Sequence, residues 1–259
     1  MKVLKKDELP KTGKVIMLYG ETGCGKTTSI LQSAPDPISY LATEPRSLQE
    51  SINAANRPDL DLDVANYENW PELIEYVSNR KNFDRYRTVV VDSYSHLMTV
   101  GLSVEIEDES FDARKEEDKA VKPITLQAKL TLEGYGGLAS NMFRLTAALC
   151  RLSQFEGKLV VITALLVENP RYNRELAAAP SLKGKEFPAN MPGFFDLIGK
   201  VETRKDENGN IVYPPLVKFE SPDGDFMAKF TGVKKPGTLA WGPLNLTKIL
   251  KFNGKEKGG

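Results

Sequence analysis

Residues 20–27 read Gly-Glu-Thr-Gly-Cys-Gly-Lys-Thr, the G-x-x-x-x-G-K-T spacing of a phosphate-binding P-loop. Its glycines let the backbone take positive φ and approach a polyphosphate closely. Backbone N–H groups and the N-terminus of the next helix then face the phosphate charge. We expect Lys26 to reach the β- and γ-phosphates and Thr27 to ligate Mg²⁺. The residues expected to bind the nucleotide are Gly20, Glu21, Thr22, Gly23, Cys24, Gly25, Lys26, Thr27 and Thr28.

Two carboxylates stand where they can serve such a site. Asp92 ends the run Val-Val-Val-Asp, and a carboxylate at a strand end beside a P-loop can hold Mg²⁺ directly or through water. Alternatively, Asp92 caps a helix that begins just after it. Glu44 follows another apolar run, where it could orient and deprotonate an attacking water. Alternatively, it is a surface residue that starts a helix with Pro45 in the first turn. We predict that Glu44 and Lys26 are catalytic and that Thr27 and Asp92 bind the metal.

Short apolar runs alternate with helical patterns along most of the chain. Runs at 14–19, 38–43, 88–92 and 159–164 are typical of buried strands, and 69–77 and 138–152 have helical spacing. This alternation predicts an α/β fold with a mostly parallel central sheet and helices on both faces. Such a sheet places the ends of several strands, and so the P-loop and both carboxylates, at one edge.

The pattern changes after residue 168. Short strand candidates at 197–204, 211–219 and 226–230 follow, and Asp-Glu-Asn-Gly-Asn at 206–210 predicts the turn of a C-terminal β-hairpin. Pro214 and Pro215 should shorten its second strand or confine it to an edge. We expect an N-terminal extension at 1–12, one domain at 13–252 and a disordered tail at 253–259.

Composition narrows the function further. Lysine plus arginine and aspartate plus glutamate both number 35, so any contact with a polyanion must come from a local patch. Two cysteines cannot form a disulfide framework, and we find no apolar segment that predicts a signal peptide or membrane span. These features favour a cytoplasmic protein. We expect the lone histidine, His96, to have a structural or surface role. We expect the acidic segment 105–118 to be a solvated loop or a frayed helix.

Together these motifs resemble the RecA-like ATPases. The chain is most similar to phage-encoded nucleotide-binding proteins of the AAA/RecA-like type, including the single-strand-annealing ATPases. The resemblance covers about residues 13 to 250, which would make 13–252 a RecA-like ATPase domain, and implies ATP and Mg²⁺ as ligands. The segments that carry it are the P-loop, Thr43-Glu44-Pro45, Val91-Asp92-Ser93, the strand at 160–163, and the pair 180–185 and 192–196.

The resemblance also implies contacts outside the nucleotide site. RecA-like proteins bind DNA through two loops, which correspond here to 103–137 and 166–192. The first is acidic. The second contains Tyr172, which could stack on a base. Alternatively, this segment is an ordinary mobile loop without a role in DNA binding. Its possible DNA-binding cations are Arg171, Arg174, Lys183 and Lys185, and a finger reaching a neighbouring subunit could be Lys229, Lys234 or Lys235.

Two features depart from the family pattern, and they leave three functions open. Thr163 is the only polar residue near the end of the expected strand at 159–164, where RecA-like proteins often carry a γ-phosphate sensor. The late Lys-Asp-Arg run of phage relatives, which suggests a finger, is replaced here by lysines. The favoured function is an ATPase that acts on single-stranded DNA in phage recombination, annealing or replication. It would form a ring or filament of identical subunits, and it could work with a phage single-strand-binding or replication protein in the host cytoplasm. The alternatives are an ATP-dependent scaffold or loading protein with little hydrolysis, and a P-loop small-molecule kinase.

Overall fold

The computed structural model describes residues 13–108, 130–231 and 242–251. The strands are β1 (Lys14–Gly20), β2 (Ile38–Ala42), β3 (Leu62–Asn66), β4 (Thr88–Asp92), β5 (Leu159–Glu168), β6 (Ala178–Pro180), β7 (Leu197–Lys205), β8 (Ile211–Lys218), β9 (Lys229–Phe230) and β10 (Gly242–Pro243). The helical elements are α1 (Lys26–Ser33), α2 (Gln49–Ala55), α3 (Trp70–Ser78), η2 (Arg80–Phe83), α4 (Tyr94–His96), η3 (Leu97–Gly101), α7 (Leu132–Glu156), α8 (Glu186–Asn190), η4 (Met191–Phe194) and α9 (Leu246–Lys251).

The strands form one mixed sheet in the order β10-β8-β7-β1-β5-β4-β2-β3. From β7 to β3 every neighbouring pair is parallel, whereas β8 and β10 join antiparallel at one end. This confirms the predicted mixed α/β fold with a mostly parallel sheet. Strand β5 lies between β1 and β4, so one strand separates the P-loop strand from the strand that ends at Asp92.

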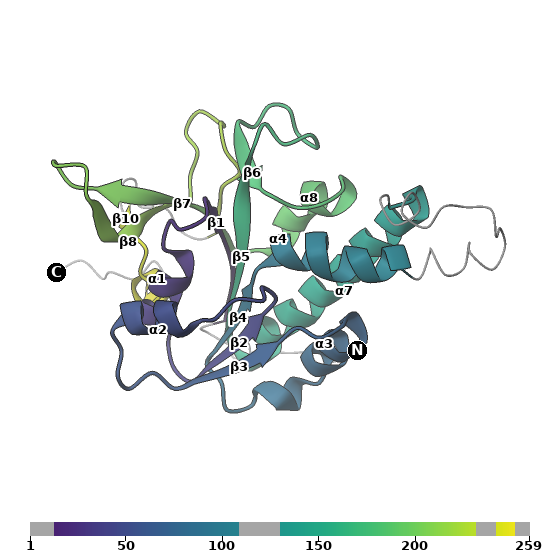
Figure 1. Cartoon of the computed structure of the whole chain (residues 1–259), viewed down its shortest axis with the longest axis horizontal. Helices are drawn as coiled ribbons and strands as arrows, with labels where there is room; N and C mark the ends of the chain where they lie inside the picture. Colours follow the sequence, from purple (N-terminus) through teal and green to yellow (C-terminus); the bar gives the residue numbers. More distant parts are fainter. Residues whose placement is uncertain (1–12, 109–129, 232–241, 252–259) are drawn as a thin grey trace.

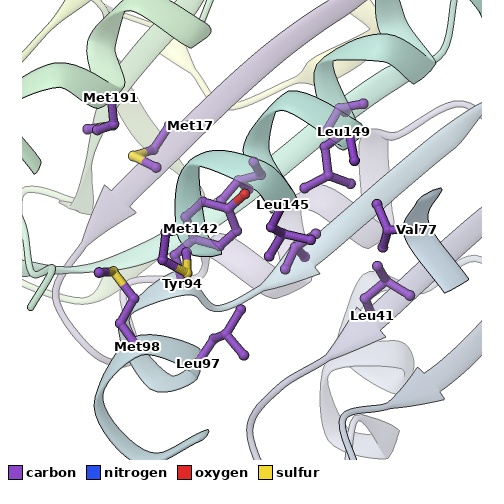
Figure 2. Packing of buried hydrophobic residues seen from close by; sticks show 14 of the residues in the cluster. Met17, Leu41, Val77, Tyr94, Leu97, Met98, Met142, Leu145, Leu149 and Met191 are labelled. Carbon is purple, nitrogen blue, oxygen red and sulfur yellow. The ribbon is translucent and has the colours of Figure 1, made fainter. Parts of the chain in front are cut away.

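Helices cover both faces of the sheet. In Figure 1, α1 and α2 lie on one side, and α3, α4 and α7 lie on the other. Strand β1 serves both layers, because its side chains alternate: Met17 packs in the cluster with α3 and α7, and Leu18 packs in the cluster with α1 and α9. Figure 2 shows Leu145 and Leu149 of α7 packed in the first of these clusters. The strand that leads into the P-loop is therefore packed on both faces, with one hydrophobic cluster on each face.

Side-chain caps explain where α3 and α7, which lie on the same face of the sheet, begin. The Asn69 side chain accepts a hydrogen bond from the Glu72 backbone N–H at 3.0 Å, which confirms the predicted helix near 69–77. Helix α7 starts at Leu132, six residues before the expected 138, because Thr131 Oγ1 accepts a hydrogen bond from Gly134 N. Its glycine-rich first turns carry few apolar residues, so the hydrophobic spacing missed them.

The predicted C-terminal hairpin is present as β7 and β8. Asp206 Oδ1 accepts hydrogen bonds from the backbone N–H groups of Asn208 at 2.9 Å and Asn210 at 2.8 Å, which closes the turn. The expectation for its prolines was partly wrong, since β10 pairs with Leu216 and Val217 of β8 beyond them. The prolines are accommodated at a register shift, where residues 213–215 lie opposite a single residue of β7.

Several predicted segments lie outside the described residues. These are the extension at 1–12, the tail at 253–259, Lys234, Lys235, and the acidic segment from 109 to 118. The described start of that acidic segment is helical, and Glu105 accepts hydrogen bonds from the Tyr67 hydroxyl and from Trp70 N. No helix in the described parts of the chain is both long and apolar enough to cross a membrane.

Candidate functional site

The P-loop joins β1 to α1 at the carboxyl edge of the sheet. Gly23 and Gly25 have φ of 76° and 91°, a region that other residues enter only with strain. Gly25 is also the N-cap of α1 and offers no side-chain cap to the first-turn N–H groups. A Cβ at Gly25 would lie 2.6 Å from the Tyr213 ring, so the hairpin closely approaches the loop. This end of α1 has the open N–H donors that a phosphate needs.

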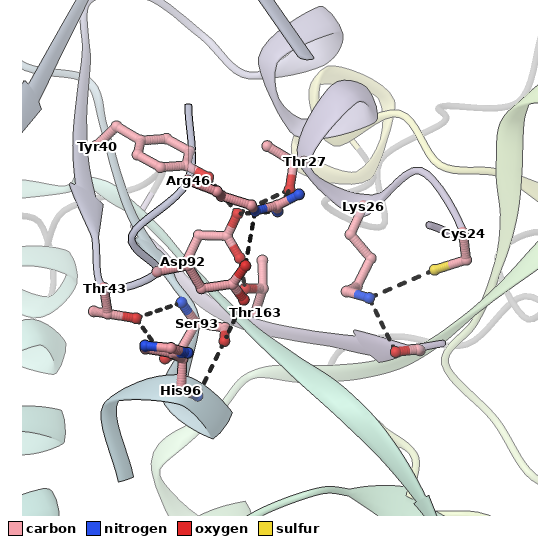
Figure 3. Close-up of polar contacts among 12 residues, drawn as sticks. Cys24, Lys26, Thr27, Tyr40, Thr43, Arg46, Asp92, Ser93, His96 and Thr163 are labelled. Atoms are coloured by element: carbon pink, nitrogen blue, oxygen red, sulfur yellow. Dashed lines mark hydrogen bonds and ion pairs between the residues drawn. The ribbon is translucent and has the colours of Figure 1, made fainter. Parts of the chain in front are cut away.

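Lys26 carries a buried charge that has no anionic partner in the described part of the chain. Its Nζ donates to the carbonyl oxygens of Gly20 and Glu21, both at 2.9 Å, and lies 3.6 Å from Cys24 Sγ (Figure 3). Its exposed fraction is 8%. Among the described residues no carboxylate lies within ion-pair distance of its ammonium. A buried ammonium whose partners are carbonyl oxygens and a thiol fits a phosphate ligand, because a buried charge is stable only when it is paired.

Asp92 is fixed beside Thr27. The Thr27 hydroxyl donates to Asp92 Oδ2 at 2.8 Å, the Tyr40 hydroxyl donates to the same oxygen, and the Thr163 hydroxyl donates to Oδ1 (Figure 3). Burial, reinforced by the Asp92 charge, raises the pKa of Tyr40 far above its usual value, so the phenol keeps the proton that it donates. The two residues predicted to bind Mg²⁺ thus lie together, and their hard oxygens suit that ion.

The alternative role of Asp92 as a helix cap does not fit the structure. Ser93 is the N-cap of α4, and its Oγ accepts a hydrogen bond from His96 N at 3.2 Å. The carboxylate of Asp92 is instead directed at Thr27. His96 follows on α4 and lines the pocket described below.

Glu44 is placed by pairing between β2 and β4. Ala42 and Asp92 are partners in register, and beyond them Thr43 Oγ1 both donates to Ser93 O and accepts from Ser93 N. Ser93 Oγ then donates to Glu44 Oε1 at 3.0 Å. The alternative in which Glu44 starts a helix does not fit, since α2 begins only at Gln49. Glu44 lies in the pocket wall close to Asp92.

The sequence analysis missed Arg46, which contacts every acidic or hydroxyl group named above as a possible metal or water ligand. Its Nε lies 2.7 Å from Glu44 Oε2, and its Nη2 lies 3.3 Å from Thr27 Oγ1 and 3.7 Å from Asp92 Oδ2. The available signal was its position two residues after Glu44, where the same strand end carries both side chains to the site.

These groups open onto a pocket of about 700 Å³. A second pocket of about 610 Å³ shares Glu44, Arg46 and His96 with it. The first pocket is lined by the P-loop and the carboxyl ends of three strands, including Thr22, Gly23, Gly25, Lys26, Thr27, Thr28, Glu44, Asp92, Leu165 and Tyr213. Its size and lining suit a nucleotide with its phosphates on the loop.

The residues predicted to bind DNA have different surroundings. About half of residues 166–192 belong to the end of β5, to β6, to α8 and to η4, so the predicted loop is interrupted by short elements. Arg171 and Arg174 are exposed in the loop between β5 and β6, and Lys185 is exposed before α8. Lys183 instead pairs with Glu107 at 3.3 Å. The Tyr172 hydroxyl is buried without a hydrogen-bond partner in the described chain, while the residue as a whole is partly exposed.

Of the three lysines predicted as a finger, only Lys229 is described. It begins β9, which pairs with β7, and its Nζ donates to the Pro192 carbonyl oxygen at 2.7 Å. This side chain is therefore bound to a carbonyl oxygen of the same chain.

Two comparisons with known proteins bear on this geometry. A family model described as an AAA domain matches residues 12–229, most of the chain. A search of curated proteins gave no match. The matched range contains the P-loop, Glu44, Arg46, Asp92 and the β5–β6 hairpin.

Proposed function

This chain belongs to the AAA domain family of P-loop nucleotide-binding ATPases, and on that premise we propose that it is a Mg²⁺-dependent ATPase acting on single-stranded DNA. We further propose that it works as a ring or filament of identical subunits in phage recombination, annealing or replication. A phage single-strand-binding or replication protein would be its partner. The observation that carries the ATPase proposal is the buried Lys26 ammonium, which lies beside the Thr27–Asp92 pair and has no carboxylate partner in the described residues.

Each residue has a distinct task in this proposal. The first-turn N–H groups of α1 and Lys26 bind the phosphates, and Thr27 and Asp92 hold the metal, which neutralises charge on the phosphate oxygens. Glu44 lies next to this group and is held by Ser93. From there its carboxylate can orient a water and accept its proton. Tyr40 and Thr163 keep Asp92 oriented.

The proposed contact with DNA rests on the hairpin formed by β5 and β6. Ser95, just beyond Asp92, has an Oγ that accepts from Leu165 N at 2.8 Å and donates to Ser181 O at 2.7 Å. Leu165 and Ser181 lie on the two sides of this hairpin and also line the nucleotide pocket. Nucleotide state can therefore influence a hairpin whose loop carries two exposed arginines. In an oligomer those loops would repeat once per subunit and form a basic track.

We expect the variant Arg171→Ala/Arg174→Ala to bind single-stranded DNA more weakly, with a shallower dependence on salt. Each lost phosphate contact removes about 0.7 from the slope of log affinity against log salt. The measurement is fluorescence anisotropy with ATP and Mg²⁺ over a salt series, paired with ATPase rates with and without DNA. Arg80→Ala/Arg85→Ala is the control, since it removes the same charge near the starts of β4 and β5, away from the pocket.

The same assays separate the competing functions. Stimulation of hydrolysis by single-stranded DNA supports the proposal. An unchanged salt slope in the Arg171/Arg174 variant would move the DNA contact elsewhere. Nucleotide binding without turnover would favour a scaffold or loading protein, and phosphoryl transfer to a nucleoside or sugar would favour a kinase.

Asp92→Asn should remove the gain in ATP affinity that Mg²⁺ provides. Asparagine has nearly the same shape but no charge, and we expect Mg²⁺ to bind about 10- to 100-fold more weakly. Calorimetric titration of ATP with Mg²⁺ and with EDTA measures this gain. Glu50→Gln is the control, because it removes the same charge from α2 in the lining of the same pocket. If Asp92→Asn retained the full Mg²⁺ effect, the metal would be held by other groups.

A further inference from the structure

The guanidinium of Arg46 lies between the two parts of the proposed catalytic site. On one side Nε is 2.7 Å from Glu44 Oε2, and on the other Nη2 is 3.3 Å from Thr27 Oγ1. Asp92 Oδ2 lies 3.7 Å from the same Nη2 (Figure 3). A single cation therefore contacts the proposed water-orienting carboxylate and both proposed metal ligands.

This arrangement conflicts with a metal at the same ligands. Two cations held at the same oxygen ligands repel each other strongly, even where solvent partly screens their charges. Arg46 and Mg²⁺ should therefore compete for Thr27 and Asp92. Arg46 can leave easily, because its side chain is 54% exposed and its contacts are at the pocket wall.

The displaced guanidinium has one obvious new partner. Among the described residues that line the pocket, Lys26 and Arg46 are the two that carry a permanent positive charge. Lys26 lies in the P-loop, whereas Arg46 follows β2 and lies beside Glu44. The terminal phosphate of a triphosphate extends from the loop towards Glu44 in the proposed function, and a diphosphate lacks that group. Arg46 is thus placed to contact the group that distinguishes ATP from ADP.

We propose that Arg46 is a positioning residue that occupies the metal ligands in the nucleotide-free protein and moves to the γ-phosphate when Mg²⁺ and ATP bind. This inference rests on the proposed function. Departure of Nε leaves Glu44 Oε2 without its ion-pair partner, so the carboxylate can accept a hydrogen bond from water. One side chain thereby keeps Glu44 occupied until a triphosphate is present.

The test measures two affinities in the presence of Mg²⁺, one for the non-hydrolysable triphosphate AMP-PNP and one for ADP. The quantity compared between variants is the ratio of AMP-PNP affinity to ADP affinity. Arg46→Ala should lower this ratio by about tenfold or more, the loss expected for one charge-assisted hydrogen bond. ADP affinity should stay the same or rise, because Mg²⁺ no longer competes with a guanidinium. Arg46→Lys should retain part of the preference, since it keeps the charge but not the planar fork.

Arg85→Ala is the matched control, because Arg85 has the same 54% side-chain exposure and pairs with surface carboxylates away from the pocket. Thermal melting without ligand verifies that each variant is folded. Equal losses of AMP-PNP and ADP affinity, or an unchanged ratio, would overturn the assignment of Arg46 while leaving the ATPase proposal intact. Failure of the wild type to bind either nucleotide would instead overturn the proposed function.

Discussion

Replacing Lys26 with alanine should abolish ATP binding. The substitution removes the buried ammonium, whose partners among the described residues are carbonyl oxygens and a thiol, and with it the positive charge of the loop. We expect a loss of affinity of about 100-fold or more, since several charge-assisted hydrogen bonds to phosphate are lost together. Calorimetric titration measures this directly. Lys14→Ala, at the other end of β1, is the control and should bind normally.

Stability adds an independent readout for the same variant. A buried charge without an anion destabilises the empty protein, so Lys26→Ala should melt at the same temperature as the wild type or higher when no nucleotide is present. Added ATP and Mg²⁺ should raise the melting temperature of the wild type only, because a ligand stabilises the state that binds it. Wild-type affinity in Lys26→Ala would contradict the assignment of the P-loop.

The second large effect is expected from Glu44→Gln. Turnover should fall by about 100-fold or more, as for the loss of a positioned general base, while ATP binding stays near the wild-type value. Glutamine keeps an oxygen for the Ser93 hydroxyl but cannot accept a proton from water. The measurements are steady-state ATP hydrolysis and calorimetric binding of AMP-PNP.

Glu50→Gln provides the control for this effect. Glu50 lines the same pocket from α2, so the change in charge is identical and only the position differs. Its hydrolysis rate should be close to that of the wild type. Normal hydrolysis by Glu44→Gln would show that another carboxylate positions the water and that the likeness to RecA-like ATPases fails at its most informative residue.

The sequence predicted the parts of the site that depend on local pattern. The P-loop is contiguous, and Glu44 and Asp92 each follow an apolar run, so their place at one sheet edge followed from strand geometry. Tyr40 and Thr163 were missed as partners of Asp92 because they come from strands distant in sequence. Only the register of the assembled sheet brings their hydroxyl groups to one carboxylate.

Predictions for exposed groups depended on information that residue type does not contain. Lys183 was predicted to contact DNA from its charge, and what residue type could not show is its ion pair with Glu107, which is distant in sequence. Tyr172 was predicted to stack on a base from its ring, and what residue type could not show is that its hydroxyl is buried. The start of α7 was missed because a polar cap and glycines, rather than apolar spacing, define its first turns.

The position of β5 in the sheet has a consequence for how the protein is made. This strand separates β1 from β4, yet it begins only at Leu159, long after both have left the ribosome. The closing of such a non-local strand pair is a late and slow event in folding. A nascent chain that stops short of β5 already contains the P-loop, Glu44 and Asp92, but lacks the strand that sets Thr27 against Asp92. During synthesis, the P-loop sequence is therefore complete before the sheet that brings Thr27 to Asp92 can assemble.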